Sequence, residues 1–134
     1  MTKKELSQLY WLKREIEADQ RRLCELEALA ISPGSPGFDG MPHAPGTGDG
    51  MARMVAEIAD LQAIISAKQI QCIHERSRLE RYIAEVPDSL TRQIFALRFI
   101  DGLSWYKVAA RVGGGNTEDS VRMRVNRYLE ETGA

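Results

Sequence analysis

The distribution of proline and glycine limits the fold of this chain more than any other feature of its sequence. Residues 32–50, SPGSPGFDGMPHAPGTGDG, contain four of the five prolines and six of the 11 glycines. Proline removes a backbone donor and glycine favours turns, so this density predicts a loop without regular structure. A loop of this length is typical of a functional segment or of a disordered one, and composition does not decide between them.

Two long helical patterns flank the loop, at about residues 3–30 and 51–86. In both, apolar residues recur in alternating steps of three and four, which is the spacing of a coiled-coil seam. The seam positions are Leu9, Leu12, Ile16, Leu23 and Leu26, then Met51, Met54, Ile58, Leu61, Ile65, Cys72, Leu79, Tyr82 and Val86. Charged residues interrupt the seams at Asp19, Lys68 and Glu75. The pattern predicts an antiparallel helical hairpin, with a dimerising coiled coil as the alternative.

The second of these helices is longer than the first, so one hairpin partner cannot cover its whole seam. We therefore expect a homodimer, in which Lys68 of one chain pairs with Glu75 of the other in a symmetric antiparallel crossing. If the chain is instead a monomer, host RNA polymerase becomes the expected partner of this stripe. The side chains expected at the oligomer interface are Ile58, Leu61, Ile65, Cys72, Leu79 and Tyr82.

Three shorter helices are predicted after Pro87, which ends the second long helix. They span about residues 90–100, 105–112 and 118–131, with Ser89, Ser104, and Asn116 or Thr117 as their N-caps. The glycines at 113–115 make the turn before the last helix, so the pattern is that of a helix-turn-helix. The predicted fold is therefore all-α, with a long helical hairpin or coiled coil over residues 1–86 and a helix-turn-helix domain over residues 87–134.

The last helix carries an apolar face and a charged face. Residues 104–129 contain five basic and two acidic side chains, a net charge of +3, although the whole chain has a net charge of −1. Arginine can donate twice to guanine and asparagine can pair with adenine, whereas arginines at the flanks suit phosphates. The side chains expected to contact duplex DNA are Ser104, Lys107, Thr117, Ser120, Arg122, Met123, Arg124, Asn126 and Arg127.

Residues 90–113, LTRQIFALRFIDGLSWYKVAARVG, followed by SVRMRVNRYL at 120–129, resemble region 4 of bacterial sigma factors. They resemble still more the short phage-encoded regulators that share this helix-turn-helix. The segment FDGMPHAPGTGDG before a heptad helix is similar to the ArpU-like phage transcriptional regulators. This resemblance implies a transcriptional regulator that binds DNA and acts on phage or prophage genes, the late ones in particular.

Within the resemblance, Arg122 and Arg124 match positions that face DNA. The framework positions of the motif are matched by Gly102, Leu103, Ser104, Ala109 and Val121. The turn GGGNTED is about two residues longer than the usual turn of the family, and Glu118 and Asp119 add negative charge where the recognition helix approaches phosphates. These departures imply either a changed docking on DNA or a domain that binds protein instead.

Two other functions fit the same sequence. The first is the small DNA-recognition subunit of a phage packaging terminase, which combines a helix-turn-helix with coiled-coil helices and forms rings. The second is an interaction module that binds RNA polymerase or a sigma factor without contacting DNA. The mass of the oligomer separates the first of these from a regulator, and a DNA-binding assay separates the second.

An enzyme is not expected, because the parts of a catalytic site are missing from the sequence. The turn GGGN lacks the lysine and the preceding strand of a phosphate loop. The cysteines, Cys24 and Cys72, and the histidines, His43 and His74, have no metal-ligand spacing, so neither a metal nor another cofactor is expected. No apolar run approaches the roughly 20 residues of a membrane helix, and no signal peptide is recognisable, so we expect a cytoplasmic protein of the bacterial host cell.

Overall fold

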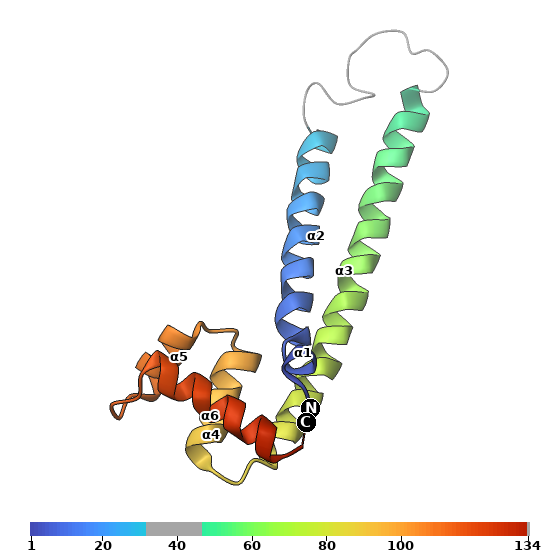
Figure 1. The fold of residues 1–134 in the computed structure, drawn as a ribbon. Coiled ribbons are helices and arrows are strands. Elements are labelled where there is room, and N and C mark those ends of the chain that lie inside the picture. The colour runs from blue at the N-terminus through green and yellow to red at the C-terminus, as the bar shows by residue number, and fades with distance from the viewer. Residues whose placement is uncertain (32–46, 134) are drawn as a thin grey trace. The chain divides into compact units, whose positions relative to one another are not determined.

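The computed structural model describes residues 1–31 and 47–133, and this part of the chain is helical apart from short connections, with no strand. The predicted all-helical class is therefore confirmed for these residues. In chain order the elements are α1 (Lys3–Leu6), α2 (Gln8–Ile31), α3 (Thr47–Ala84), α4 (Ser89–Phe95), the π-helical turn η1 (Ala96–Ile100), α5 (Trp105–Val112) and α6 (Glu118–Glu131) (Figure 1).

The boundaries of the helices differ from the predicted ones at a few local signals. α3 begins at Thr47, four residues before the predicted start, and so includes Gly48 and Gly50 of the glycine-rich stretch. The cap of α4 is Asp88 instead of Ser89, because its side chain accepts a hydrogen bond from the backbone N–H of Thr91. The remainder of the predicted loop, residues 32–46, lies outside the described residues.

The chain divides into two compact units, one formed by residues 14–71 and the other by residues 1–13 together with 72–134. This division differs from the predicted boundary at residue 87. The reason is that Leu6 and Leu9, near the N-terminus, and Leu79 and Ile83, near the end of α3, are buried in one cluster with residues of α4 to α6. The first turns of the chain and the end of α3 therefore belong to the C-terminal core.

In the unit of residues 14–71, α2 and α3 bury few side chains, namely Ile16, Leu26 and Ile65. The Nζ atom of Lys68 lies 2.6 Å from Oδ2 of Asp19. The hydrogen bond to Asp19 is the largest of the effects that raise the pKa of Lys68 above its ordinary value. Lys68, which was expected to meet Glu75 of a second copy, is thus paired with Asp19 of the same chain.

The other unit is built around the fully buried ring of Phe95. Its ring centroid lies 6.1 Å from that of Tyr82, 5.6 Å from that of Phe99 and 5.5 Å from that of Tyr128. Burial raises the pKa of the Tyr82 hydroxyl. The buried residues of this cluster are Leu6, Leu9, Leu79, Ile83, Ile94, Phe95, Phe99, Ile100, Val108, Ala109, Val121, Val125 and Leu129.

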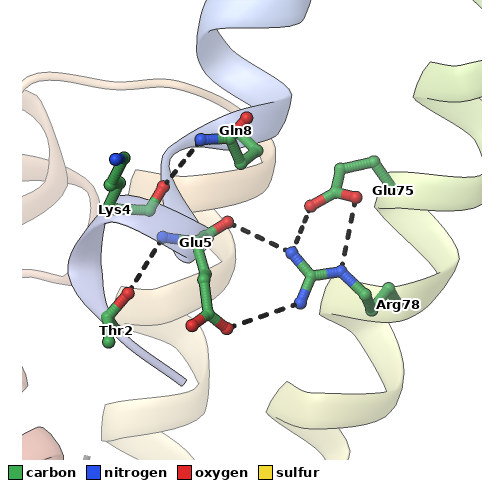
Figure 2. A network of polar contacts seen from close by, with 6 residues as sticks. All are labelled: Thr2, Lys4, Glu5, Gln8, Glu75 and Arg78. Atoms are coloured by element: carbon green, nitrogen blue, oxygen red, sulfur yellow. Dashed lines mark hydrogen bonds and ion pairs between the residues drawn. The ribbon is translucent and has the colours of Figure 1, made fainter.

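Polar contacts hold the N-terminal turns in this unit (Figure 2). The guanidinium of Arg78 donates to the carboxylate of Glu75 and, over 3.2 Å, to the backbone carbonyl of Glu5. Nζ of Lys13 donates to the backbone carbonyl of Ile100 over 3.1 Å. Charge-assisted bonds of this kind are stronger than neutral ones, so they fix the N-terminal turns against the end of α3 and the end of η1.

Candidate nucleic-acid interface

The pair α5 and α6 owes its position to apolar residues that recur along each helix. Val108 and Ala109 of α5 and Val121, Val125 and Leu129 of α6 are all buried. The residues of α6 lie four apart, so they form one narrow stripe and leave the opposite face of the helix to solvent. Burial of the stripe therefore determines which side chains of α6 a partner can reach.

The start of α6 is defined by a glycine turn and a reciprocal cap. Gly113, Gly114 and Gly115 have φ angles of 63°, 64° and 78°, a region that side chains with a Cβ rarely enter. The Thr117 hydroxyl accepts from the backbone N–H of Ser120 over 3.1 Å, and the Ser120 hydroxyl accepts from that of Thr117 over 2.8 Å. The cap at Thr117 was one of two predicted alternatives and is confirmed.

The hydroxyls expected to contact DNA thus accept hydrogen bonds from backbone N–H groups at the starts of the helices. Ser104 does the same for α5, since its Oγ atom accepts from the backbone N–H of Lys107 over 3.3 Å. Ser104, Thr117 and Ser120 are nevertheless all exposed. Their first role is to fix where the two helices begin, and a ligand can share their remaining lone pairs.

Part of the exposed face of α6 lines an open hollow of about 570 Å³. Its wall on α6 includes Met123, Arg124 and Arg127, and its opposite wall comes from the connection between α3 and α4 and the first turn of α4. The lining residues are Val86, Pro87, Asp88, Thr91, Ser120, Met123, Arg124, Arg127, Tyr128 and Glu131. Four of the predicted contact residues, Ser120, Met123, Arg124 and Arg127, are therefore brought together here.

The two arginines of the hollow differ in their surroundings. Arg124 forms an ion pair with Asp88, with 3.1 Å between Nη1 and Oδ2. Asp88 also accepts from the Thr91 hydroxyl over 2.6 Å, and the hydrogen bonds from Thr91, above all that of its side chain, lower the pKa of Asp88. The guanidinium of Arg127 has no ion-pair partner among residues 1–31 and 47–133 and stays available to an anion.

Sequence reasoning missed Asp88 and Thr91 as parts of this site. The signal for the cap was present, because aspartate is a strong N-cap residue and Asp88 directly precedes Ser89. Nothing in the local sequence, however, indicates that Asp88 meets an arginine 36 residues further along the chain.

Arg122 and Asn126 do not share this hollow. Arg122 is exposed and pairs with Asp119 one turn earlier, over 2.6 Å. Asn126, which was expected to contact DNA, is half-buried, and its Oδ1 atom is buried without a hydrogen-bond partner within the described part of the chain. It lines a smaller hollow with Thr2 and Lys3, so these N-terminal residues lie beside the side of α6 on which Asn126 is found.

The residues expected at an oligomer interface lie on the side of α3 that is turned into the chain. Ile65 and Leu79 are buried, and the other four are half-buried. Tyr82 packs against Phe95 in the core. The large apolar side chains of α3 that remain exposed are instead Val55, Ile64, Ile70 and Ile73.

Among residues 1–31 and 47–133, no group of three or more histidine, cysteine, aspartate or glutamate side chains could hold a metal ion. Burial raises the pKa of the Cys72 thiol, and Cys24 is exposed. None of the described helices combines the length and the apolar character that crossing a membrane requires.

Comparison with known proteins gives no relative for this chain. No protein-family model matches it, and no curated protein or solved structure shows significant similarity to it.

Proposed function

We propose that residues 87–134 form a helix-turn-helix domain that binds duplex DNA, with α6 as the recognition helix. On the resemblance of this region to phage-encoded regulators, the protein is a transcriptional regulator of phage or prophage genes. The observation that supports this function best is the exposed face of α6, where Met123, Arg124 and Arg127 line one hollow while the opposite face is held by the core.

The electrostatics of this face favour a phosphate ligand. Arg127 is a cation with no ion-pair partner in the described residues, and an arginine releases a counterion from DNA when it neutralises a phosphate. Arg124 is held by Asp88, so a phosphate that binds it must compete with that carboxylate. The charge of Arg122 is offset by Asp119 on the same helix. Of the three arginines of α6, Arg127 is therefore expected to contribute most to binding.

The decisive experiment is a duplex-binding titration at several salt concentrations, using a site selected from a random pool and the random pool itself. Arg127→Ala should weaken the binding of both duplexes and lower the slope of log K against log salt by about one. The matched control is Arg22→Ala, which removes the same charge from an exposed position of α2. A wild-type protein that binds no duplex at low salt would exclude the function and favour an interaction module for RNA polymerase or a sigma factor.

We also propose that α2 and α3 form an antiparallel hairpin. In the unit of residues 1–13 and 72–134, Glu5 pairs with Arg78. Burial raises the pKa of the Cys72 thiol, and the charge of Lys13 offsets part of that rise, so Lys13 lies close to Cys72. The residue number thus rises along the first helix while it falls along the second, which is the sense of a hairpin.

A homodimer is proposed as the form that acts on DNA, because regulators that read paired half-sites need two recognition helices. The exposed side of α3 supports it. Val55 and Ile70 are 56% and 55% exposed, and the positions between them on this side are uncharged. A solvated helix face normally carries charges, so this one is suited to burial against another helix. The uncharged positions are Ala59, Gln62, Ala63 and Ser66.

Light scattering tests the dimer. Ile70→Asp should convert the dimer to a monomer, because a buried unpaired carboxylate is costly. Gln71→Asp is the matched control, since it adds the same charge at a neighbouring exposed position on another side of the helix. A monomeric wild type at tens of micromolar would contradict the dimer, and a large ring would favour the packaging subunit.

A further inference from the structure

A further hollow lies at the start of α5, within the unit of residues 1–13 and 72–134. Its volume is about 470 Å³. It lies between the first turns of α2 and the connection from η1 to α5, two segments that are far apart in the sequence. The lining residues are Ser7, Tyr10, Trp11, Arg98, Phe99, Gly102, Ser104 and Lys107.

The floor of this hollow is held in a fixed shape. Gly102 has a φ of +72°, and a Cβ atom there would lie 3.3 Å from Cδ2 of Tyr10, so the backbone and this ring are in close contact. The guanidinium carbon of Arg98 lies 4.5 Å from the centre of the Trp105 ring, and Nη1 of Arg98 donates to the carbonyl of Leu103 over 3.0 Å. These contacts place the Arg98 charge without the help of a carboxylate.

The lining is positively charged. It contains Arg98 and Lys107 and no aspartate or glutamate. Neither cation forms an ion pair with any residue that the structure describes. The two cations repel each other, so an anion that binds between them is attracted by both and offsets their repulsion.

The same hollow has an aromatic wall that is open to solvent. The side chain of Trp11 is 58% exposed, and its ring stands edge-on to that of Tyr10 with 5.0 Å between the centroids. An exposed indole next to unpaired cations suits a ligand that has both an anionic group and an apolar surface. The deoxyribose and phosphate of a DNA backbone combine these two properties.

We propose that this hollow binds the backbone of the duplex, with a phosphate near Arg98 and Lys107 and a sugar against Trp11. The inference rests on the DNA-binding function proposed above and extends the interface from α6 to the N-terminal helix. Ser104 and Lys107 link the two parts, because both line the hollow, Ser104 caps α5 and Lys107 lies in its first turn, and α5 precedes the recognition helix.

The test uses the same salt titration with the full chain. Trp11→Ala should weaken duplex binding roughly three- to tenfold and leave the salt slope unchanged, because a neutral side chain releases no counterion. Trp11→Phe should restore part of the affinity. Lys107→Ala should instead lower the salt slope by about one. Leu29→Ala is the control for the loss of an exposed apolar side chain, and Arg22→Ala is the control for the loss of an exposed cation.

The possible outcomes separate this inference from the function on which it rests. If Arg127→Ala weakens binding while Trp11→Ala and Lys107→Ala bind like the wild type, the hollow is not part of the interface and α6 alone carries the function. If the wild type binds no duplex, both proposals fail. If Trp11→Ala weakens binding to single strands but not to duplex, the ligand of the hollow is a base and the backbone proposal is overturned. Thermal melting of each variant verifies that Trp11 and Lys107, both exposed, are not needed for folding.

Discussion

The two units of this chain bury their apolar side chains to very different extents. Around Phe95, three further aromatic rings and residues from the start of the chain to α6 close a core. In residues 14–71, the two helices bury a thin seam and leave large apolar side chains in solvent. Those exposed side chains are Leu29, Ile31, Val55, Ile64 and Ile70.

This difference indicates that the two units are specified in different ways. A closed core is specific because its rings fit together at the density of a solid. Two helices that share a thin seam can slide along each other by a turn, and a polar pair in the seam can prevent this. The contacts of Lys68 with Asp19, at 2.6 Å, and with Glu15, at 3.4 Å, are suited to that task, because a shift along the helices changes both distances.

The largest effect on the free energy of unfolding is expected at Phe95. Phe95→Ala removes a fully buried ring and should cost about 3–5 kcal/mol of the free energy of unfolding. Chemical denaturation monitored by circular dichroism measures this loss. Tyr106→Ala, at a residue that is 70% exposed, is the control and should change stability by less than about 0.5 kcal/mol. A loss of similar size in both variants would show that the aromatic cluster does not carry the stability of this unit.

The next largest effect on stability is expected at the pair of Lys68 and Asp19 in the thin seam. Asp19→Leu and Lys68→Leu should each lower the melting temperature. Lys68→Leu leaves Asp19 without its partner, and Asp19→Leu leaves Lys68 with only Glu15, at 3.4 Å. The double variant should recover most of the loss, since an apolar pair of similar size has no desolvation cost. A double-mutant cycle measures the coupling. If the two losses simply add, the pair is not coupled and does not determine how the helices align.

The smallest effect concerns Asp88, and it should change with pH only in acid. The folded chain holds the pKa of Asp88 below its ordinary value of 3.8, so the ionised carboxylate stabilises the fold. This contribution is complete above that ordinary value and is lost as the pH falls through the lowered pKa. Asp88→Asn keeps an oxygen that can cap α4 and removes the charge. The difference in unfolding free energy between wild type and variant should therefore be constant near neutral pH and shrink below about pH 4. A difference that persists in acid would assign the effect to the shape of the cap instead of its charge.

The helices and their caps could be predicted largely because their signals are local. Ser104 and Thr117 precede apolar periodic runs, and each caps the helix that was expected there. The buried stripe of α6 follows from the spacing of Val121, Val125 and Leu129. These inferences need only neighbouring residues, and local chemistry decides them.

The parts that could not be predicted depend on contacts between distant residues. The period of α6 shows that Asn126 lies near the edge of the buried stripe, but not that Thr2 and Lys3 lie beside that edge. Likewise, the seam of α3 indicates that Leu79 must be buried, but not that its own C-terminal core buries it. The sequence pattern identifies a face that needs a partner, and only the fold identifies the partner.

The burial of Leu6 and Leu9 in the same cluster as Val125 and Leu129 has a consequence for biosynthesis. These leucines leave the ribosome before the residues of α6 that enclose them have been translated. Until then, two large apolar side chains have no native environment, and non-native contacts or a chaperone must shield them. Contacts between residues so far apart in the sequence also slow folding, because the loop that joins them must close first. The core that contains Phe95 can therefore be completed only after translation has reached the end of α6.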